Sequence, residues 1–317
     1  MKTKLIFPLI TFIVTSCTPK SFVLGSKVFC FDTVVSIELY EGKDEDVKNI
    51  EEILKYYDKL SDNYLSRDIT NVYTINNTNE TIEVSKDLYD LLKSSMEVTS
   101  KGANYFNLLA GSLSKRWKES LSQNQVLSQN EINEELDKLN DSSLSLYPNN
   151  LIKRLGEAEI DLGGIAKGYT LDVIKDYLDS KEYKHYIING GSSSILLGEK
   201  NLGDGCFTVG MQKELPGAYF KAKNCFISTS SNSEQGVEID GTVYSHIINP
   251  ITGSAITNYD SVIVLSEDGY LGDALSTSMM MNTIEEIEQI EKDQNVKTII
   301  VKDGKIVYKH VGIEVFR

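Results

Sequence analysis

Four segments in the second half of the chain combine residue types and spacings that suit binding of an anion or a metal ion. In the first, from Asp161 to Tyr169, the pair Gly163-Gly164 precedes a stretch with helical periodicity. A glycine pair lets the backbone approach a ligand closely, and a helix N-terminus offers free N–H groups and the positive end of the dipole. Lys167 adds a cation, which favours a phosphate or carboxylate partner nearby. The alternative is a glycine turn between a strand and a helix, with a solvated lysine.

The second and third segments place polar side chains at predicted strand ends. Asn189, which precedes two glycines, carries an amide able to bind the edge of a nucleotide, although an ordinary hairpin turn explains the same residues. His246 precedes a turn, from Asn249 to Gly253, that contains Pro250. Because histidine titrates near neutrality, this imidazole can serve as an acid, a base or a phosphate ligand. A purely structural histidine is the alternative.

The fourth segment suits a hard metal ion. If the chain from Gly272 onward is helical, Asp273 and Thr277 are four residues apart and share one face, with Ser276 beside them. A carboxylate, a hydroxyl and nearby backbone carbonyls are the oxygen ligands that Mg²⁺ prefers. The alternative is that Asp273 caps the helix N-terminus and the small residues serve helix packing.

Composition excludes some partners. The chain has 317 residues and a net charge of −14, so a nucleic-acid backbone would be repelled. An anionic ligand must therefore be held by local dipoles, a metal ion or a few well-placed cations. The three histidines are scattered, and Cys30, Cys206 and Cys225 show no metal-binding spacing. Those cysteines allow either one disulfide with a free thiol or three buried thiols.

The N-terminal segment has the features of an export signal. Lys2 and Lys4 precede a short apolar stretch, Leu5–Val14, which falls well below the roughly 20 residues that a membrane-spanning helix needs. Cys17 follows small residues, as at a bacterial lipoprotein cleavage site; an ordinary signal peptide is the alternative. We expect a signal peptide over 1–16, a tether over 17–26 and one domain over 27–317. The expected location is lipid-anchored through Cys17, at the periplasmic face of the inner membrane.

Periodicity along the chain predicts a single α+β domain. A strand is expected over 27–40 and a loop over 66–84, and a polar surface excursion over 120–150 is expected to contain a short helix near 130–140. Other helices are predicted over 41–64, 85–101, 166–180, 270–281 and 283–292. Strands are predicted over 184–189, 194–198, 206–211, 224–229, 242–247, 260–266, 297–301 and 305–309.

In order along the chain, five motifs resemble the ApbE family of FAD:protein FMN transferases. They are D-L-G-G-I-A-K-G-Y (161–169), N-G-G (189–191), S-T-S-S (228–231), H-I-I-N-P-I-T-G (246–253) and D-A-L-S-T-S (273–278). Upstream, 31–33, 68–70 and 105–111 resemble further family segments, so the similarity covers nearly all of 27–310. It implies an α+β, T-fold-related single domain with mixed sheets and flanking helices.

The resemblance also implies a site. In the family, FAD lies in a cleft with its diphosphate over Mg²⁺. Matching positions imply that Asp273 and Thr277 bind the metal through side chains, with the carbonyls of Gly164 and Ser276. Asp273 is implied as a catalytic residue through the metal, and His246 as one beside the diphosphate. The residues implied to contact FAD are Asn63, Tyr105, Phe106, Asn107, Asp161, Lys167, Asn189 and His246.

The implied reaction transfers FMN from FAD to a Thr or Ser hydroxyl of an acceptor flavoprotein and releases AMP. The acceptor class comprises subunits of redox ion pumps and flavin-binding reductases. Asn63 stands where the family has an aromatic residue, unless the alignment slips by one and places Tyr64 there. Losing that ring would cost about 1 kcal/mol of ligand stacking and admit water, which predicts FAD hydrolysis to FMN and AMP. Asn107 and Asn249 replace aspartates of the family pattern.

Two further readings stay open beside transfer and hydrolysis. One is an exported flavoprotein that keeps FAD bound and passes electrons. The other is a flavin-scavenging lipoprotein that binds FAD without chemistry. Asp273 and Thr277 argue against a pure binder, because such a protein has less need of a metal.

Overall fold

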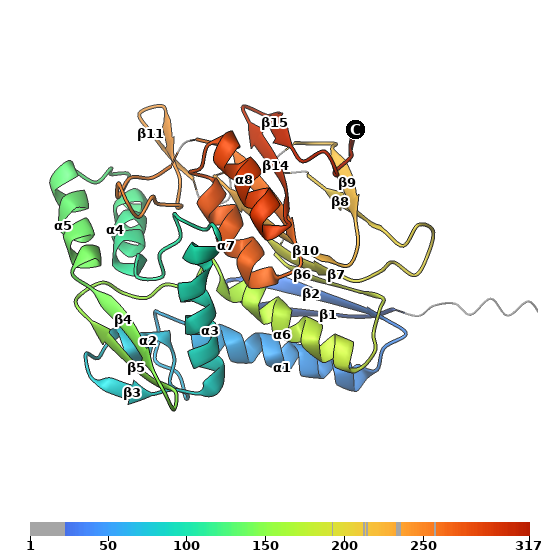
Figure 1. The fold of residues 1–317 in the computed structure, drawn as a ribbon, viewed down its shortest axis with the longest axis horizontal. Coiled ribbons are helices and arrows are strands. Elements are labelled where there is room, and N and C mark those ends of the chain that lie inside the picture. The colour runs from blue at the N-terminus through green and yellow to red at the C-terminus, as the bar shows by residue number, and fades with distance from the viewer. Residues whose placement is uncertain (1–22, 192, 212, 214, 233–235, 257) are drawn as a thin grey trace, which may run out of the picture.

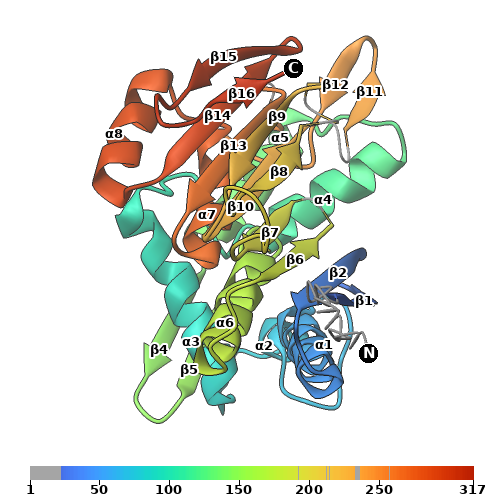
Figure 2. The same cartoon turned by 90° about the vertical axis from the view of Figure 1, so that its right-hand side faces the viewer.

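An eight-stranded antiparallel sheet runs through the molecule in a computed structural model of the chain, shown in Figures 1 and 2. The residues described are 23–191, 193–211, 213, 215–232, 236–256 and 258–317. In spatial order, the strands are β1 (Val23–Cys30), β2 (Thr33–Tyr40), β6 (Tyr186–Gly190), β7 (Ser194–Leu197), β10 (Cys225–Ser231), β13 (Ser261–Ser266), β14 (Lys297–Lys302) and β15 (Lys305–Lys309).

The N-terminal strand prediction is wrong in one respect. Residues 27–40 do not form one strand; β1 and β2 form a hairpin that reverses at Phe31 and Asp32. Both turn residues have positive φ, 51° and 55°, as expected for a two-residue turn that matches the twist of the flanking strands. The alternation of apolar residues continues across the turn, so the sequence pattern hides it. β1 begins at Val23, within the segment expected to be tether, and Cys17 lies outside the described residues.

Helices cover one face of the sheet (Figure 1). They include α1 (Asp44–Ser61), α6 (Ala166–Ser180), α7 (Gly269–Met279), α8 (Ile284–Gln294) and α3 (Lys86–Glu97), which continues as the 3₁₀ helix η1 (Val98–Lys101). A three-stranded sheet of β8 (Phe207–Gly210), β9 (Tyr219–Ala222) and β16 (Val315–Phe316) covers the other face. Successive side chains of β10 alternate between the layers: Phe226 packs with α1 and α6, and Ile227 packs with β8 and β9.

The remaining elements extend the molecule beside the helical layer. They are α2 (Val72–Asn76), α4 (Gly111–Ser122), α5 (Gln129–Asn140), the sheet of β3 (Thr81–Glu83), β5 (Leu151–Leu155) and β4 (Ser143–Tyr147), and the hairpin of β11 (Val237–Ile239) and β12 (Thr242–Tyr244). The helices expected near 130–140, over 166–180 and over 283–292 are confirmed. The strands predicted over 206–211 and 242–247 are found as β8 and, in part, β12. The sequence missed α4 and the other strands of the small sheets, which are two to five residues long. The loop expected over 66–84 is wrong in part, because α2 and β3 form within it. Every strand pairing found in the described ranges is antiparallel.

The expected α+β fold in one domain is confirmed. Cys30, Cys206 and Cys225 are free thiols; only Cys30 is buried, and burial raises its pKa to about 12. No helix among the residues described is long and apolar enough to cross a bilayer.

Candidate functional site

Helices α6 and α7 touch backbone to backbone because glycines line their contact. A Cβ atom on Gly168 would lie 2.1 Å from the carbonyl oxygen of Gly269, and one on Gly269 would lie 2.4 Å from the carbonyl oxygen of Gly168. Side chains larger than hydrogen would force the helices apart. The residues predicted to carry chemistry, Gly164 to Gly168 and Asp273 to Thr277, therefore meet along this contact.

Asp273 lies inside α7 with its carboxylate buried. It accepts hydrogen bonds from the N–H of Gly168 at 2.7 Å, from the hydroxyl of Ser194 at 2.9 and 3.0 Å, and from the hydroxyl of Ser228 at 2.6 Å. Burial raises the pKa of Asp273, while the Ser228 bond and the charge of Lys167 oppose that rise. The capping alternative is excluded, because Asp268 holds the N-cap position of α7.

Hydroxyl groups gather around the backbone carbonyl of Asp273. Thr277 Oγ1 and Ser276 Oγ donate to the Asp273 carbonyl at 3.2 and 2.9 Å. Ser230 Oγ lies 2.9 Å from Ser276 Oγ and 3.2 Å from Thr277 Oγ1. Gly164 is adjacent, since a Cβ there would lie 3.5 Å from Thr277 Oγ1. The four predicted metal ligands thus lie in one small region.

These residues fit a magnesium ion. A carboxylate offers about four acceptor positions, and three donors occupy them around Asp273. All three donors are neutral, so the negative charge of the carboxylate is left for a cation, which would replace one of these hydrogen bonds. Within the described part of the chain, no group of three or more His, Cys, Asp or Glu side chains could hold a metal. A metal here would depend on one carboxylate plus hydroxyl and carbonyl oxygens, which suits Mg²⁺ with a shell rich in water.

The anion site expected at the start of α6 differs from the prediction. The N–H groups of Gly163, Ala166 and Gly168 are already bonded, to Asp161 Oδ1, the Leu162 carbonyl and Asp273 Oδ2. A carboxylate from α7 therefore takes the place expected of a ligand phosphate. The sequence could not show this, because Asp273 is more than 100 residues away.

The loop that contains Tyr105, Phe106 and Asn107 closes against the same region. The Tyr105 N–H donates to the Ser278 hydroxyl at 3.0 Å, and the buried Phe106 ring would be 3.3 Å from a Cβ on Gly164. Asn107 is exposed, and its side-chain oxygen accepts from the Leu109 N–H at 2.9 Å. An aspartate could accept the same bond, so the departure from the family pattern preserves the loop.

Asp161 and Lys167 lie at opposite sides of the Gly163-Gly164 turn. Asp161 is half-buried, and burial raises its pKa. Lys167 Nζ donates to Ser193 Oγ at 2.6 Å, beside the turn between β6 and β7. Asn189 lies in β6 and pairs with Ile195 of β7. Lys167 therefore contacts the turn between β6 and β7, and its positive charge also stabilises the ionised carboxylate of Asp273.

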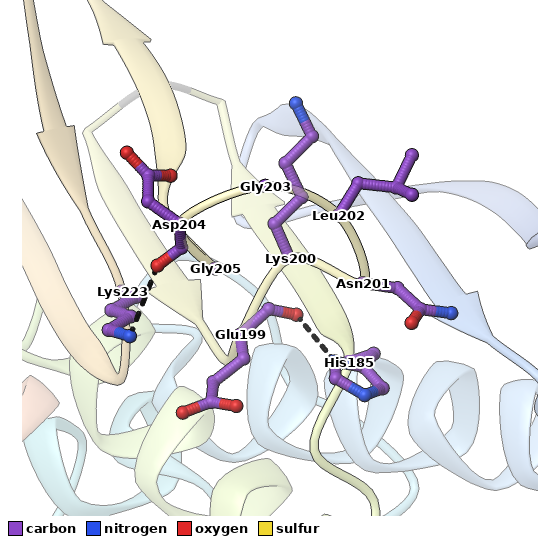
Figure 3. Close-up of a pocket in the computed structure, with 9 residues that line it drawn as sticks. All are labelled: His185, Glu199, Lys200, Asn201, Leu202, Gly203, Asp204, Gly205 and Lys223. Carbon is purple, nitrogen blue, oxygen red and sulfur yellow. Dashed lines mark hydrogen bonds between the residues drawn. The ribbon is translucent and has the colours of Figure 1, made fainter.

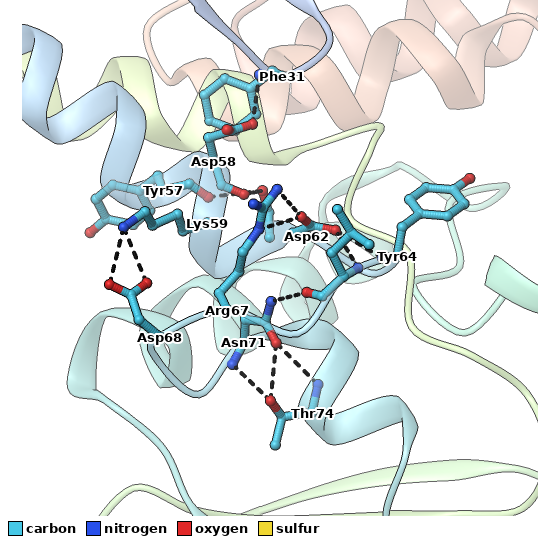
Figure 4. A network of polar contacts seen from close by, with 12 residues as sticks. Phe31, Tyr57, Asp58, Lys59, Asp62, Tyr64, Arg67, Asp68, Asn71 and Thr74 are labelled. Carbon is cyan, nitrogen blue, oxygen red and sulfur yellow. Dashed lines mark hydrogen bonds and ion pairs between the residues drawn. The ribbon is translucent and has the colours of Figure 1, made fainter.

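Hydrogen bonds to Asp62 hold the turn that follows α1 and carries Tyr64 (Figure 4). Asp62 Oδ1 accepts from the N–H groups of Tyr64 and Leu65 at 2.8 and 3.0 Å, and its other oxygen pairs with Arg67. The Tyr64 side chain is 49% exposed, and Lys118 Nζ lies 5.2 Å from its ring centre. The charge of Lys118 opposes the rise in the pKa of Asp161. Asn63, by contrast with Tyr64, is half-buried.

His246 is exposed and precedes a rigid loop. Asn249 Oδ1 accepts from the N–H groups of Ile251 and Thr252 at 2.8 and 3.1 Å. The Gly253 carbonyl accepts from Trp117 Nε1 at 2.7 Å, which fastens the loop to α4. The predicted rigid support behind the imidazole is present, and Asn249 closes the turn as an aspartate would.

Two surface depressions lie elsewhere. One is formed around the loop after β7, as Figure 3 shows. The other lies beside the C-terminal half of α6 and the start of β10. Neither is lined by a predicted site residue. The Ser194 end of β7 touches Asp273, and the depressions lie at the Leu197 end, so they are separate from the candidate site.

Sequence reasoning missed several residues that build the site. Ser228 and Ser230 lie in a quoted motif but had no assigned role, and Ser194, Lys118 and Asp172 were not singled out. The missed residues come from other elements, and only tertiary contacts bring them together. Asp172 alone left a signal, since it follows Gly164 and Gly168 at intervals of four.

Comparisons with known proteins agree with this arrangement. The chain is 27% identical over 253 residues, 77% of each chain, to the FAD:protein FMN transferase of Klebsiella pneumoniae. It is 34% identical over 151 residues, 44% of this chain and 43% of the relative, to that of Vibrio cholerae. The ApbE protein of Thermotoga maritima has a similar fold, with a TM-score of 0.79 and 23% identity over 92% of this chain and 97% of its own.

The Vibrio cholerae flavin transferase ApbE also shares the fold, with a TM-score of 0.73 and 20% identity over 93% and 97% of the two chains. The ApbE family model matches residues 31–300. That match spans most of the described fold and all the motifs of the candidate site. The chain belongs to the ApbE family.

Proposed function

We propose that this protein is a Mg²⁺-dependent FAD:protein FMN transferase. The observation that carries the proposal is the buried Asp273, whose backbone carbonyl accepts from the hydroxyls of Ser276 and Thr277, with Gly164 next to Thr277. Oxygen ligands of this kind suit a metal ion that binds a diphosphate. The names of its relatives point to the same reaction.

The chemistry divides among the chain's own residues. Bound Mg²⁺ would supply charge stabilisation to the diphosphate, as phosphoryl transfer generally needs. FAD is oriented by Lys167, Asn189 and the loop at Tyr105 to Asn107. Asp161 holds the glycine turn by accepting from the N–H of Gly163. The acceptor hydroxyl oxygen forms a bond to the FMN-side phosphorus, the bond to the AMP phosphate breaks, and AMP leaves. His246, exposed beside its rigid loop, takes the hydroxyl proton.

Hydrolysis of FAD is the second candidate activity. Hydrolysis is predicted if Asn63 fills the aromatic position, and the alternative places the exposed ring of Tyr64 there. A ring at that position can stack on the ligand and exclude water from the acceptor's position. We therefore expect transfer to dominate if Tyr64 fills it.

The acceptor is a flavoprotein with a Thr or Ser flavinylation motif, such as a redox ion-pump subunit or a flavin-binding reductase. The protein itself is exported and anchored by lipid on Cys17 at the periplasmic face of the inner membrane. The sequence of 1–17 supports this location. The Cys17→Ser protein should still be exported, but it should no longer be found in the membrane fraction.

The deciding experiment incubates residues 18–317 with FAD, with and without Mg²⁺ and an acceptor protein, and follows AMP and FMN by chromatography. Mg²⁺-dependent AMP with one FMN added to the acceptor's mass is expected. AMP with only free FMN would identify a hydrolase. Unreacted FAD recovered with the protein would identify a flavin-binding lipoprotein and contradict the proposal.

A further inference from the structure

The N-terminus of α7 is capped by a residue from another helix. Asp268 holds its N-cap position but makes no side-chain capping bond. Instead, the first two N–H groups of the helix, on Gly269 and Tyr270, donate to Asp172 of α6 at 2.7 and 2.8 Å. Each carboxylate oxygen accepts one of them. Asp172 thus satisfies two of the four N–H groups that a helix start leaves open.

The start of α6 is capped in return by α7. Its N-cap residue, Ile165, has no side-chain bond to offer, and the N–H of Gly168 donates to Asp273. Each helix therefore supplies a carboxylate to the N-terminus of the other. A negative charge at a helix N-terminus is also favoured by the dipole, so both caps stabilise the same pairing.

The two caps fix how far α7 can slide along α6. Gly164, which lies just before α6, and Gly168 and Asp172 within it are spaced by four in the sequence. They face Thr277, Asp273 and Gly269 in turn, which are spaced by four along α7. The glycine contacts set the separation of the helices but carry no directional bond. The Asp172 bonds are directional, and they act one helical turn from Asp273.

We propose that Asp172 is a positioning residue for the metal site, which holds Asp273 and Thr277 in register with Gly164. The proposal rests on the proposed function, because it concerns the same metal. Removing Asp172 leaves two N–H groups of α7 without their acceptor in a half-buried place. The first turn of α7 then shifts or frays, and the Asp273 carboxylate moves with it.

The test uses residues 18–317, which lack the signal segment and Cys17, at pH 8. Burial raises the pKa of Asp172 to about 7, so its carboxylate is then mostly ionised. Asp172→Asn keeps one acceptor oxygen and the side-chain size, and Asp172→Ala removes both. Mg²⁺ affinity is measured by calorimetry, and AMP release from FAD is measured against Mg²⁺ concentration. For Asp172→Asn we expect a Mg²⁺ dissociation constant about tenfold higher, as for other supporting residues of metal sites.

At saturating Mg²⁺, kcat of Asp172→Asn should return close to the wild-type value, because the ligands themselves are intact. Glu291→Gln is the matched control. Glu291 is a buried carboxylate that likewise accepts a backbone N–H, from Thr298 at 2.7 Å, and it lies in α8 away from the site. It should lower the Tm and leave Mg²⁺ affinity unchanged.

An unchanged Mg²⁺ affinity in Asp172→Asn, or an equal loss in Glu291→Gln, would overturn the positioning role. The proposed function is judged separately, by whether the wild-type protein needs Mg²⁺ to release AMP. Either conclusion can therefore fail without the other.

Discussion

Gly168→Ala should separate the two helices that form the site. The added Cβ would lie 2.1 Å from the Gly269 carbonyl oxygen and 2.8 Å from Asp273 Cγ. An ordinary contact begins near 3.4 Å, so the helices must part by about 1 Å, since 3.4 − 2.1 = 1.3 Å. Overpacking of this kind costs about 1–3 kcal/mol. Alanine's better helix propensity returns up to about 1 kcal/mol.

Because the clash at 2.1 Å is with backbone, the cost lies at the upper end of that range. The net loss of about 2 kcal/mol should lower the Tm by about 4–8 °C, measured by calorimetry. Activity should fall further than stability does, because the shift moves Asp273, and a displacement of about 1 Å at a reacting centre can cost about 100-fold in rate. AMP release from FAD at saturating Mg²⁺ measures this loss.

Gly25→Ala is the control for adding a methyl group. Its Cβ would meet the Ile37 carbonyl oxygen at 3.7 Å, an ordinary contact. It should leave Tm and activity near wild type. A Gly168→Ala protein with an unchanged or higher Tm would refute the reasoning, because the two backbones could then not be in contact as described.

Three further variants test the site and its support. Asp273→Asn should raise the Mg²⁺ dissociation constant and slow AMP release by at least about 100-fold, because a bound metal contributes several kcal/mol. His246→Ala should slow AMP release less, and equal losses in the two variants would contradict the assignment of Asp273 as the metal ligand. Two tyrosine hydroxyls hold the pKa of Asp46 below its ordinary 3.8, so Asp46→Asn should lower the free energy of unfolding in urea by about 2 kcal/mol at pH 7. That difference should persist while Asp46 is ionised and shrink as the pH falls below 3.8 toward the lowered pKa of the folded state; a difference that grows in acid would contradict it. Tyr64→Ala should raise KM for FAD about fivefold and increase free FMN relative to transferred FMN, and Tyr147→Ala, also an exposed tyrosine, should change neither.

Local signals predicted the long elements well. The helix over 166–180 was placed at its actual bounds because its apolar residues repeat at helical spacing after a glycine turn. The turn at Phe31 and Asp32 was missed because neither residue is glycine and the alternation of β1 runs directly into β2. The partners of the N–H groups at the anion site expected around Gly163-Gly164 could not be predicted. Two of these groups, on Gly163 and Gly168, are bonded by carboxylates, one of them distant in sequence.

The sequence alone determined which residue types are present and which lie together on one helix face, as Asp273 and Thr277 do at a spacing of four. That follows from helix geometry, which needs no tertiary contact. It also determined the family, through motifs in fixed order. Only the tertiary structure decided what those residues face: that Asp273 caps α6 and that Asp172 caps α7. The physical reason is that hydrogen bonds and close packing between helices depend on their register, and distant segments set that register together.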